Sequence, residues 1–468
     1  MDLKLRFFGA AKNVTGSCYL LEANGNRLLI DCGLYQERKL KPRNWADFPV
    51  PVDTIDAVLL THAHLDHCGR LPKLVKEGFK GPVYATAATG EIANIIMQDS
   101  AHIQEEDIKN KKRRHERSGK KSPFPYEPLY TMEDAEKTKL LFRVAKYKVA
   151  IPVGIGITAE FREAGHVFGS SSIRITVEQG GETRSIVFSG DVGRWNLPIM
   201  RDPHQFEHAD YVLIESTYGD RVHGEVADIP GELERIINET HRVGGNIIIP
   251  SFALERTQEL LYHLNNLLNE DRIPHLLAFV DSPMAVKITE VFKKHPELFD
   301  EETIAHLEAG DQPCNFPGLT MTRTVDQSKS INHIKGTAII IAGSGMCTGG
   351  RIKHHIKNNI GRPESTILFV GYQAFGTLGR HLLDKAETVR LFGEEHQVKA
   401  RIERISGFSA HADQNELYQW LSSIKSPPRK VFITHGEESQ STAFRNFLTE
   451  KTGWNCVVPE YDQEVILD

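Results

Sequence analysis

The sequence has few cysteines, no long apolar run and no excess of positive charge. Its six cysteines include no C-x-x-C pair and are too sparse for a disulfide framework, so a reducing, cytoplasmic setting is expected. No apolar run approaches the ~20 residues that span a bilayer, and Met1–Phe8 lacks the shape of a signal peptide, which argues against a membrane partner. The net charge of −6 excludes a broadly cationic nucleic-acid binder but allows a local basic groove.

Short apolar strands dominate the first half of the chain, and strands alternate regularly with helices in the second half. Runs such as Leu3–Phe8, Ala57–Leu60 and Tyr211–Ile214 predict strands, whereas Thr89–Gln104 predicts a helix. Between about residues 219 and 395 the alternation predicts a parallel sheet in a second α/β domain. We therefore expect an α/β protein with segments 1–218, 219–395 and 396–468.

One segment is strongly basic. Residues Lys109–Lys121 include eight Lys or Arg and one Glu. Such a run is most simply a solvated helix end and loop, and the alternative is an electrostatic contact for a polyanion.

The densest cluster of functional side chains is Thr61–His67, with the sequence T-H-A-H-L-D-H, directly after a predicted strand. Imidazole nitrogens and a carboxylate at this spacing suit zinc or a similar divalent ion, whereas a polar turn with incidental histidines is the structural alternative. On a tight turn His62 and His64 can point to one side, and Asp66 and His67 can point to a second ion. The motif predicts a dinuclear site that needs further ligands.

Candidates for those further ligands follow other predicted strands. Asp191 and His435 each lie just after an apolar run, whereas His166 is followed by a Gly/Ser turn and a predicted strand. Either histidine alone would more often be an ordinary one. Together with the first cluster they indicate ligand loops gathered at one sheet edge. Asp31 shares the strand-end position, and we expect it to orient another group rather than bind metal.

These motifs resemble those of a known family. H-x-H-x-D-H with a downstream His, Asp and His is similar to the metallo-β-lactamase superfamily. The long insertion before His435, together with Leu213–Gly219 (LIESTYG) and Phe408–Asp413 (FSAHAD), resembles the β-CASP group of nucleases. Further matches are P-S-F-A at 250–253, G-S-G-M at 343–346 and G-Y-Q at 371–373. The resemblance covers essentially the whole chain and is greatest to bacterial and archaeal relatives of the endonuclease subunit of the cleavage and polyadenylation specificity factor.

The resemblance implies an αββα sandwich with a β-CASP domain inserted on a parallel sheet, and two zinc ions. One zinc would be held by His62, His64 and His166, and the other by Asp66, His67 and His435, with Asp191 bridging both. Glu215 and His411 match the additional acidic and histidine motifs of the group, and they are expected to be catalytic together with Asp66. His435 at the last motif favours RNA over DNA.

The implied reaction is hydrolysis of single-stranded RNA through a metal-bridging hydroxide, with His411 as general acid held by Glu215. Three alternatives stay open: a 5′–3′ exoribonuclease, a metallohydrolase of a small substrate, and an RNA-binding scaffold subunit. The complete ligand set argues against the scaffold, and the inserted domain argues against a small substrate. A homodimer is compatible with the sequence, which does not fix the oligomeric state.

Possible phosphate contacts lie in the inserted segment. The Gly-rich turn Gly343–Met346, with Ser344 and Gly345, could cradle a phosphate through backbone N–H groups, although tight-turn geometry alone explains such a turn equally well. Arg256, Arg351 and Arg380 could supply cations to a cleft between the sandwich and the inserted domain, or could form ordinary surface pairs.

Overall fold

The protein forms two compact units, and the computed structural model describes residues 2–119, 126–224 and 228–468. Unit 1 comprises Met1–Leu197, Arg201–Val222 and Ala410–Asp468, and unit 2 comprises Pro198–Met200 and His223–Ser409. The chain leaves unit 2 later than the expected segment boundary at residue 395, because the strand β19 (Arg401–Arg404) belongs to the sheet of unit 2.

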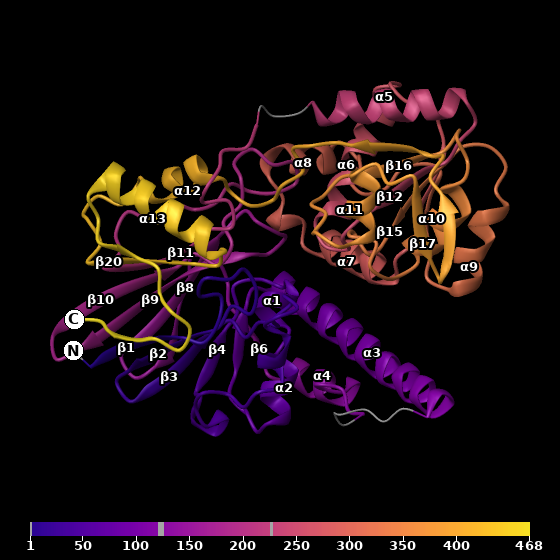
Figure 1. The fold of residues 1–468 in the computed structure, drawn as a ribbon. Helices are drawn as coiled ribbons and strands as arrows, with labels where there is room; N and C mark the ends of the chain where they lie inside the picture. Colours follow the sequence, from indigo (N-terminus) through magenta and orange to yellow (C-terminus); the bar gives the residue numbers. More distant parts are fainter. Residues whose placement is uncertain (1, 120–125, 225–227) are drawn as a thin grey trace. The chain divides into compact units, whose positions relative to one another are not determined.

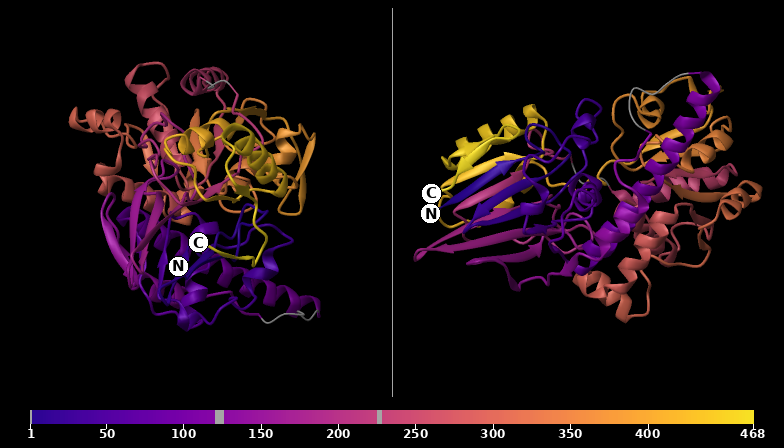
Figure 2. Two further views of the ribbon diagram at one scale, coloured as in Figure 1. Left: turned by 90° about the vertical axis from the view of Figure 1, so that its left-hand side faces the viewer. Right: turned by 90° about the horizontal axis from the view of Figure 1, so that it is seen from below.

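Unit 1 contains two seven-stranded sheets. Across the first lie β22 (Glu464–Ile466), β1 (Leu3–Phe7), β2 (Tyr19–Ala23), β3 (Asn26–Ile30), β4 (Ala57–Leu59), β5 (Val83–Ala85) and β6 (Phe142–Val144). Across the second lie β21 (Cys456–Val457), β20 (Lys430–Thr434), β11 (Tyr211–Glu215), β10 (Glu182–Phe188), β9 (Ser171–Gln179), β8 (Ile157–Glu163) and β7 (Ala150–Gly154). Because β1 pairs with β22, the two termini lie together in every view (Figures 1 and 2).

Alternating side chains of the two sheets form the core of unit 1. In β1, Leu3, Leu5 and Phe7 are fully buried, whereas Lys4 and Arg6 on the opposite face are partly exposed. The buried side chains pack in one cluster with apolar residues of β9 and β10 from the second sheet. Each such Leu or Phe contributes roughly 1.5–3 kcal/mol relative to an exposed side chain.

Helices cover the outer faces of both sheets. They are α1 (Leu65–Cys68), α2 (Leu71–Lys76), α3 (Ala87–Ser118), α4 (Met132–Lys139), α12 (Gln414–Leu421) and α13 (Glu438–Thr452). Trp420 of α12 and Phe444 of α13 belong to one buried apolar cluster with Ile433 of β20. Unit 1 is therefore the expected αββα sandwich (Figure 1).

The basic segment lies mainly on the last turns of α3, which extend away from the sheets of unit 1 (Figure 1). Its last residues, Lys120 and Lys121, lie outside the described residues. Among the described helices, none combines the length and the apolar character needed to cross a bilayer.

Unit 2 is built on a six-stranded sheet in which every described pairing is parallel. Its order is β14 (Leu319–Met321), β13 (Leu277–Val280), β15 (Ala338–Ala342), β12 (Ile247–Pro250), β16 (Thr366–Phe369) and β19. Its helices are α5 (Ile229–Arg242), α6 (Arg256–Asn269), α7 (Pro283–Lys294), α8 (Glu301–Glu308), α9 (Val325–Ser330), α10 (Ile352–Asn359) and α11 (Leu378–Leu383), with a hairpin of β17 (Thr388–Leu391) and β18 (Glu394–Gln397). The fully buried, Ile-rich strands β12 and β15 are typical of a parallel sheet covered on both faces. The expected α/β domain on a parallel sheet is confirmed.

Candidate metal centre and active site

The histidine motif and its expected partners lie on loops at strand ends of unit 1. The motif follows β4 and runs into α1, while His166, Asp191 and His435 follow β8, β10 and β20. Asp31 and His435 adopt φ angles of 58° and 50°, a left-handed conformation that is uncommon for residues other than glycine. Such strained backbone concentrates at functional sites.

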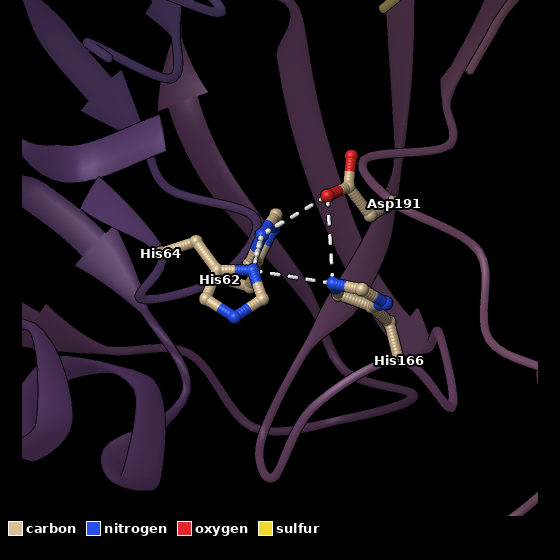
Figure 3. A group of neighbouring side chains, drawn as sticks. All are labelled: His62, His64, His166 and Asp191. Atoms are coloured by element: carbon tan, nitrogen blue, oxygen red, sulfur yellow. Dashed lines mark hydrogen bonds and ion pairs between the residues drawn. The ribbon is translucent and has the colours of Figure 1, made fainter. Parts of the chain in front are cut away.

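Three histidines and one aspartate form the first donor group (Figure 3). The Nδ1 atom of His64 lies 3.1 Å from His62 Nε2 and 3.2 Å from His166 Nε2. Asp191 Oδ2 lies 3.4 Å from both His62 Nε2 and His166 Nε2. Ligands about 2.0–2.1 Å from a tetrahedral zinc ion are about 3.4 Å apart, so these spacings fit one ion.

The second donor group uses the other carboxylate oxygen of Asp191. His67 Nε2 lies 3.1 Å from His435 Nε2 and 3.3 Å from Asp191 Oδ1. Asp66 Oδ2 lies 3.5 Å from His435 Nε2. Asp191 therefore faces each donor group with one oxygen.

The protonation states of the first donor group fit a metal cation. Burial lowers the pKa of His62 to about 3 and that of His64 to about 4, which keeps both rings in the neutral form that binds metal. Burial alone would raise the pKa of Asp191, but His435 and His67 hold it well below its ordinary value. Asp191 Oδ1 is buried and accepts no hydrogen bond from any described residue. This oxygen is therefore available to bind a cation.

Neighbouring side chains orient the histidines. His67 Nδ1 donates to Asp31 Oδ2 over 2.7 Å, which directs Nε2 toward the donor group. Thr61 donates to the same carboxylate from its backbone N and from Oγ1, both over 2.8 Å. Thr217 Oγ1 lies 3.2 Å from His435 Nδ1. Sequence reasoning gave Thr61 and Thr217 no role, although both lie within motifs that it singled out.

His411 lies beside the first donor group, with its ring centroid 4.4 Å from that of His166. Its Nδ1 contacts the two carboxylate oxygens of Glu215 at 3.1 and 3.2 Å. Burial disfavours the charged ring, but the Glu215 carboxylate outweighs this effect and raises the pKa of His411 to about 9. Backbone N–H groups of Val192 and Thr217 donate to Glu215, so its carboxylate is fixed from two sides.

Successive parts of the chain match three family models. These are the metallo-beta-lactamase superfamily at residues 12–216, the Beta-Casp domain at 257–382 and the Zn-dependent metallo-hydrolase RNA specificity domain at 395–459. A ribonuclease of Thermus thermophilus is 39% identical over 441 residues, which cover 94% of this chain and 95% of that protein. The chain belongs to the metallo-β-lactamase superfamily and to its β-CASP group.

Two further matches are less similar in sequence. The transcription termination factor FttA of Methanocaldococcus jannaschii is 29% identical, over 94% of this chain and 68% of that protein. A crystal structure of a protein of unknown function from Enterococcus faecalis matches the whole chain with a TM-score of 0.56 and 14% identity, and so shares the fold alone. The expected family is confirmed, and this β-CASP protein is a metal-dependent hydrolase.

The predicted RNA contacts of the β-CASP protein lie in unit 2, where the three arginines already have acidic partners. Arg256 is buried, pairs with Glu259 and lies 4.8 Å over the Phe408 ring. Arg380 pairs with Asp384 at 2.9 Å on the surface. Their role in binding RNA stays a prediction.

Arg351 and Ser344 are likewise engaged within unit 2. Arg351 pairs with the buried carboxylate of Asp281 at 2.7 Å. Ser344 Oγ accepts hydrogen bonds from the backbone N–H groups of Thr348 and Gly349, which closes the turn that also contains Gly345. These contacts stabilise the fold, and whether the turn also binds phosphate stays a prediction.

Arg351→Gln is expected to lower the free energy of unfolding by roughly 1.5–3 kcal/mol, because it removes a charged donor from buried Asp281. His355 Nε2 remains 2.7 Å from the other oxygen of Asp281 and limits the loss. Urea unfolding measures the change. Arg380→Gln is the matched control, since its exposed pair is expected to contribute at most ~1 kcal/mol.

The same variants test RNA contact by affinity at several salt concentrations. Loss of one phosphate contact lowers the magnitude of the salt slope by roughly 0.7 for a single strand. A reduced slope for Arg351→Gln without loss of stability would make Arg351 an RNA contact rather than a partner of Asp281.

Proposed function

We propose that this β-CASP protein is a zinc-dependent endoribonuclease that cuts single-stranded RNA in the cytoplasm and leaves 3′-hydroxyl and 5′-phosphate ends. The observation that carries the proposal is the convergence of six donor residues, three on each side of Asp191. The named ribonuclease among its relatives supports RNA as the substrate. A homodimer is a separate prediction that light scattering tests.

The donor groups support two zinc ions per chain. One would be held by His62, His64 and His166, the other by Asp66, His67 and His435, with Asp191 shared between them. Bound zinc would supply an activated water at neutral pH and would compensate charge on the phosphoryl oxygens.

The remaining chemistry falls to His411 and Glu215. The departing 3′-oxygen needs a proton, and we assign its donation to His411. Glu215 contacts Nδ1 of that ring, and we assign the proton transfer to the other ring nitrogen, Nε2. Because two backbone N–H groups hold Glu215, its function is to fix the ring of His411 rather than to bind metal.

A time course on one RNA labelled at either end tests the mode of cleavage. Internal fragments that appear first from both labels are the expected result. Mononucleotides released from the 5′ end would instead support the 5′–3′ exoribonuclease alternative.

The preference for single strands has its own test. The labelled RNA should be cut far faster alone than annealed to its complement, because the bases of a duplex are already stacked and paired. Initial rates on the two forms measure the preference, and equal rates would contradict it.

A further inference from the structure

Three large aromatic side chains of unit 2 are exposed and take no part in the metal centre. Phe252 follows β12, and Tyr372 and Phe375 follow β16. Their exposed fractions are 42%, 64% and 93%, the last being the highest among the large apolar side chains in the described part of the chain. Burying such rings is favourable, so several together indicate an interaction surface.

The three rings share one edge of the sheet. Strands β15, β12 and β16 are adjacent and parallel, so the loops that follow them lie at the same carboxyl edge. Open α/β sheets bind their ligands at this edge. The Gly-rich turn after β15 belongs to the same group of loops.

Glycines hold the Phe252 ring in place. A Cβ atom at Gly345 would lie 2.8 Å from this ring, and one at Gly371 would lie 3.7 Å from it. The ring therefore packs close to the backbone of these two glycines. Buried Gln373 donates from Nε2 to the carbonyl of Gly345 over 2.8 Å and joins the loop after β16 to the Gly-rich turn. These contacts fix the position of the Phe252 ring and tie the loop after β16 to the Gly-rich turn.

The chemistry of this surface fits unpaired nucleotides. Aromatic rings bind single strands by stacking on bases, and this stacking tolerates any sequence because every base has a π-face. Arg380, in the helix that follows the Tyr372–Phe375 loop, adds a partly exposed cation. A duplex keeps its bases inside and offers none to such rings.

We propose that Phe252, Tyr372 and Phe375 form a stacking platform for unpaired RNA bases. The inference rests on the proposed ribonuclease function and names the part of the substrate that unit 2 recognises, namely the bases. Stacking on these rings would also explain the proposed preference of the enzyme for single-stranded RNA, because a duplex offers no free bases.

The test is fluorescence anisotropy with the full zinc-loaded chain. The His411→Ala background slows cleavage, and the probes are a labelled oligouridine and an abasic ribose-phosphate oligomer of the same length. Phe375→Ala and Tyr372→Ala are each expected to weaken oligouridine binding about tenfold, in the range of one lost stacking contact. Binding of the abasic oligomer and the salt slope should not change, because no phosphate contact is lost.

Two further variants sharpen the test. Phe375→Tyr should bind oligouridine more tightly than Phe375→Ala does, since tyrosine keeps an aromatic face. Phe392→Ala is the matched control, because this ring is half exposed but lies on the β17–β18 hairpin. The Phe392→Ala variant should bind both probes with the same affinity as the His411→Ala background protein.

Unchanged oligouridine affinity in both alanine variants, or equal weakening for the two probes, would overturn the platform. A change of oligomeric state with RNA affinity intact would also overturn it and would indicate a protein-docking surface. Neither result bears on whether the wild-type chain cuts RNA, so the proposed nuclease function would still stand. Base-specific weakening in a chain whose wild type cuts no RNA would support the platform and contradict the nuclease.

Discussion

His64→Ala is expected to lose metal and RNA cleavage together. His64 Nδ1 lies 3.1 and 3.2 Å from the donor nitrogens of His62 and His166, so the substitution removes the atom that both neighbours face. A zinc site with one protein ligand fewer has lower affinity, and without metal no activated water is supplied. Metal analysis should give about two zinc ions per wild-type chain and fewer in the variant, in which cleavage should be undetectable.

His241→Ala is the matched control for this experiment. His241 is exposed near the end of α5, so the same substitution there should leave metal content and activity intact. A wild-type chain that stays fully active after exhaustive chelation would contradict the metal-dependent mechanism.

His411→Ala is expected to retain both metals and to lower turnover by roughly 10²-fold or more, because it removes acid catalysis but no metal ligand. The ring lies beside that of His166, yet its Nδ1 is engaged by Glu215, which separates its role from that of the ligands. The measurement is kcat together with metal content.

Glu215→Gln gives a companion test of the same role. The amide can still contact the ring but has no charge, so kcat should fall with metal content unchanged. Metal loss in His411→Ala equal to that in His64→Ala would show that His411 is a ligand and that its assignment as acid is wrong.

Local patterns in the sequence predict the elements of the fold well, because the strand and helix periods are short-range signals. The helix expected at Thr89–Gln104 continues as α3 through the basic segment to Ser118, where pairs such as Lys109 with Glu106 at 3.0 Å support it. The basic run from Lys109 to Ser118 is thus the end of this helix, as the simpler interpretation of the sequence predicted.

Local sequence motifs likewise predict one part of the metal site, whereas the other part depends on how the chain folds. His62 to His67 form a contiguous motif, whereas bringing His435 to His67 depends on strand order across the whole second sheet. The strand-end motifs indicated that these loops gather at one sheet edge, and the family resemblance implied that His435 joins Asp66 and His67. The pairing of Arg351 with Asp281 could not be predicted, because it joins two loops of unit 2 that no motif links.

The order of the strands also determines when this centre can exist during synthesis. β11 and β20 are parallel neighbours, yet all of unit 2 except Pro198–Met200 lies between them in the sequence. A nascent chain that has emerged only as far as unit 2 therefore lacks β20, and with it His435, the partner of Asp66 and His67. The ribosome must therefore finish the inserted unit before the residues of the second donor group are all present in the chain.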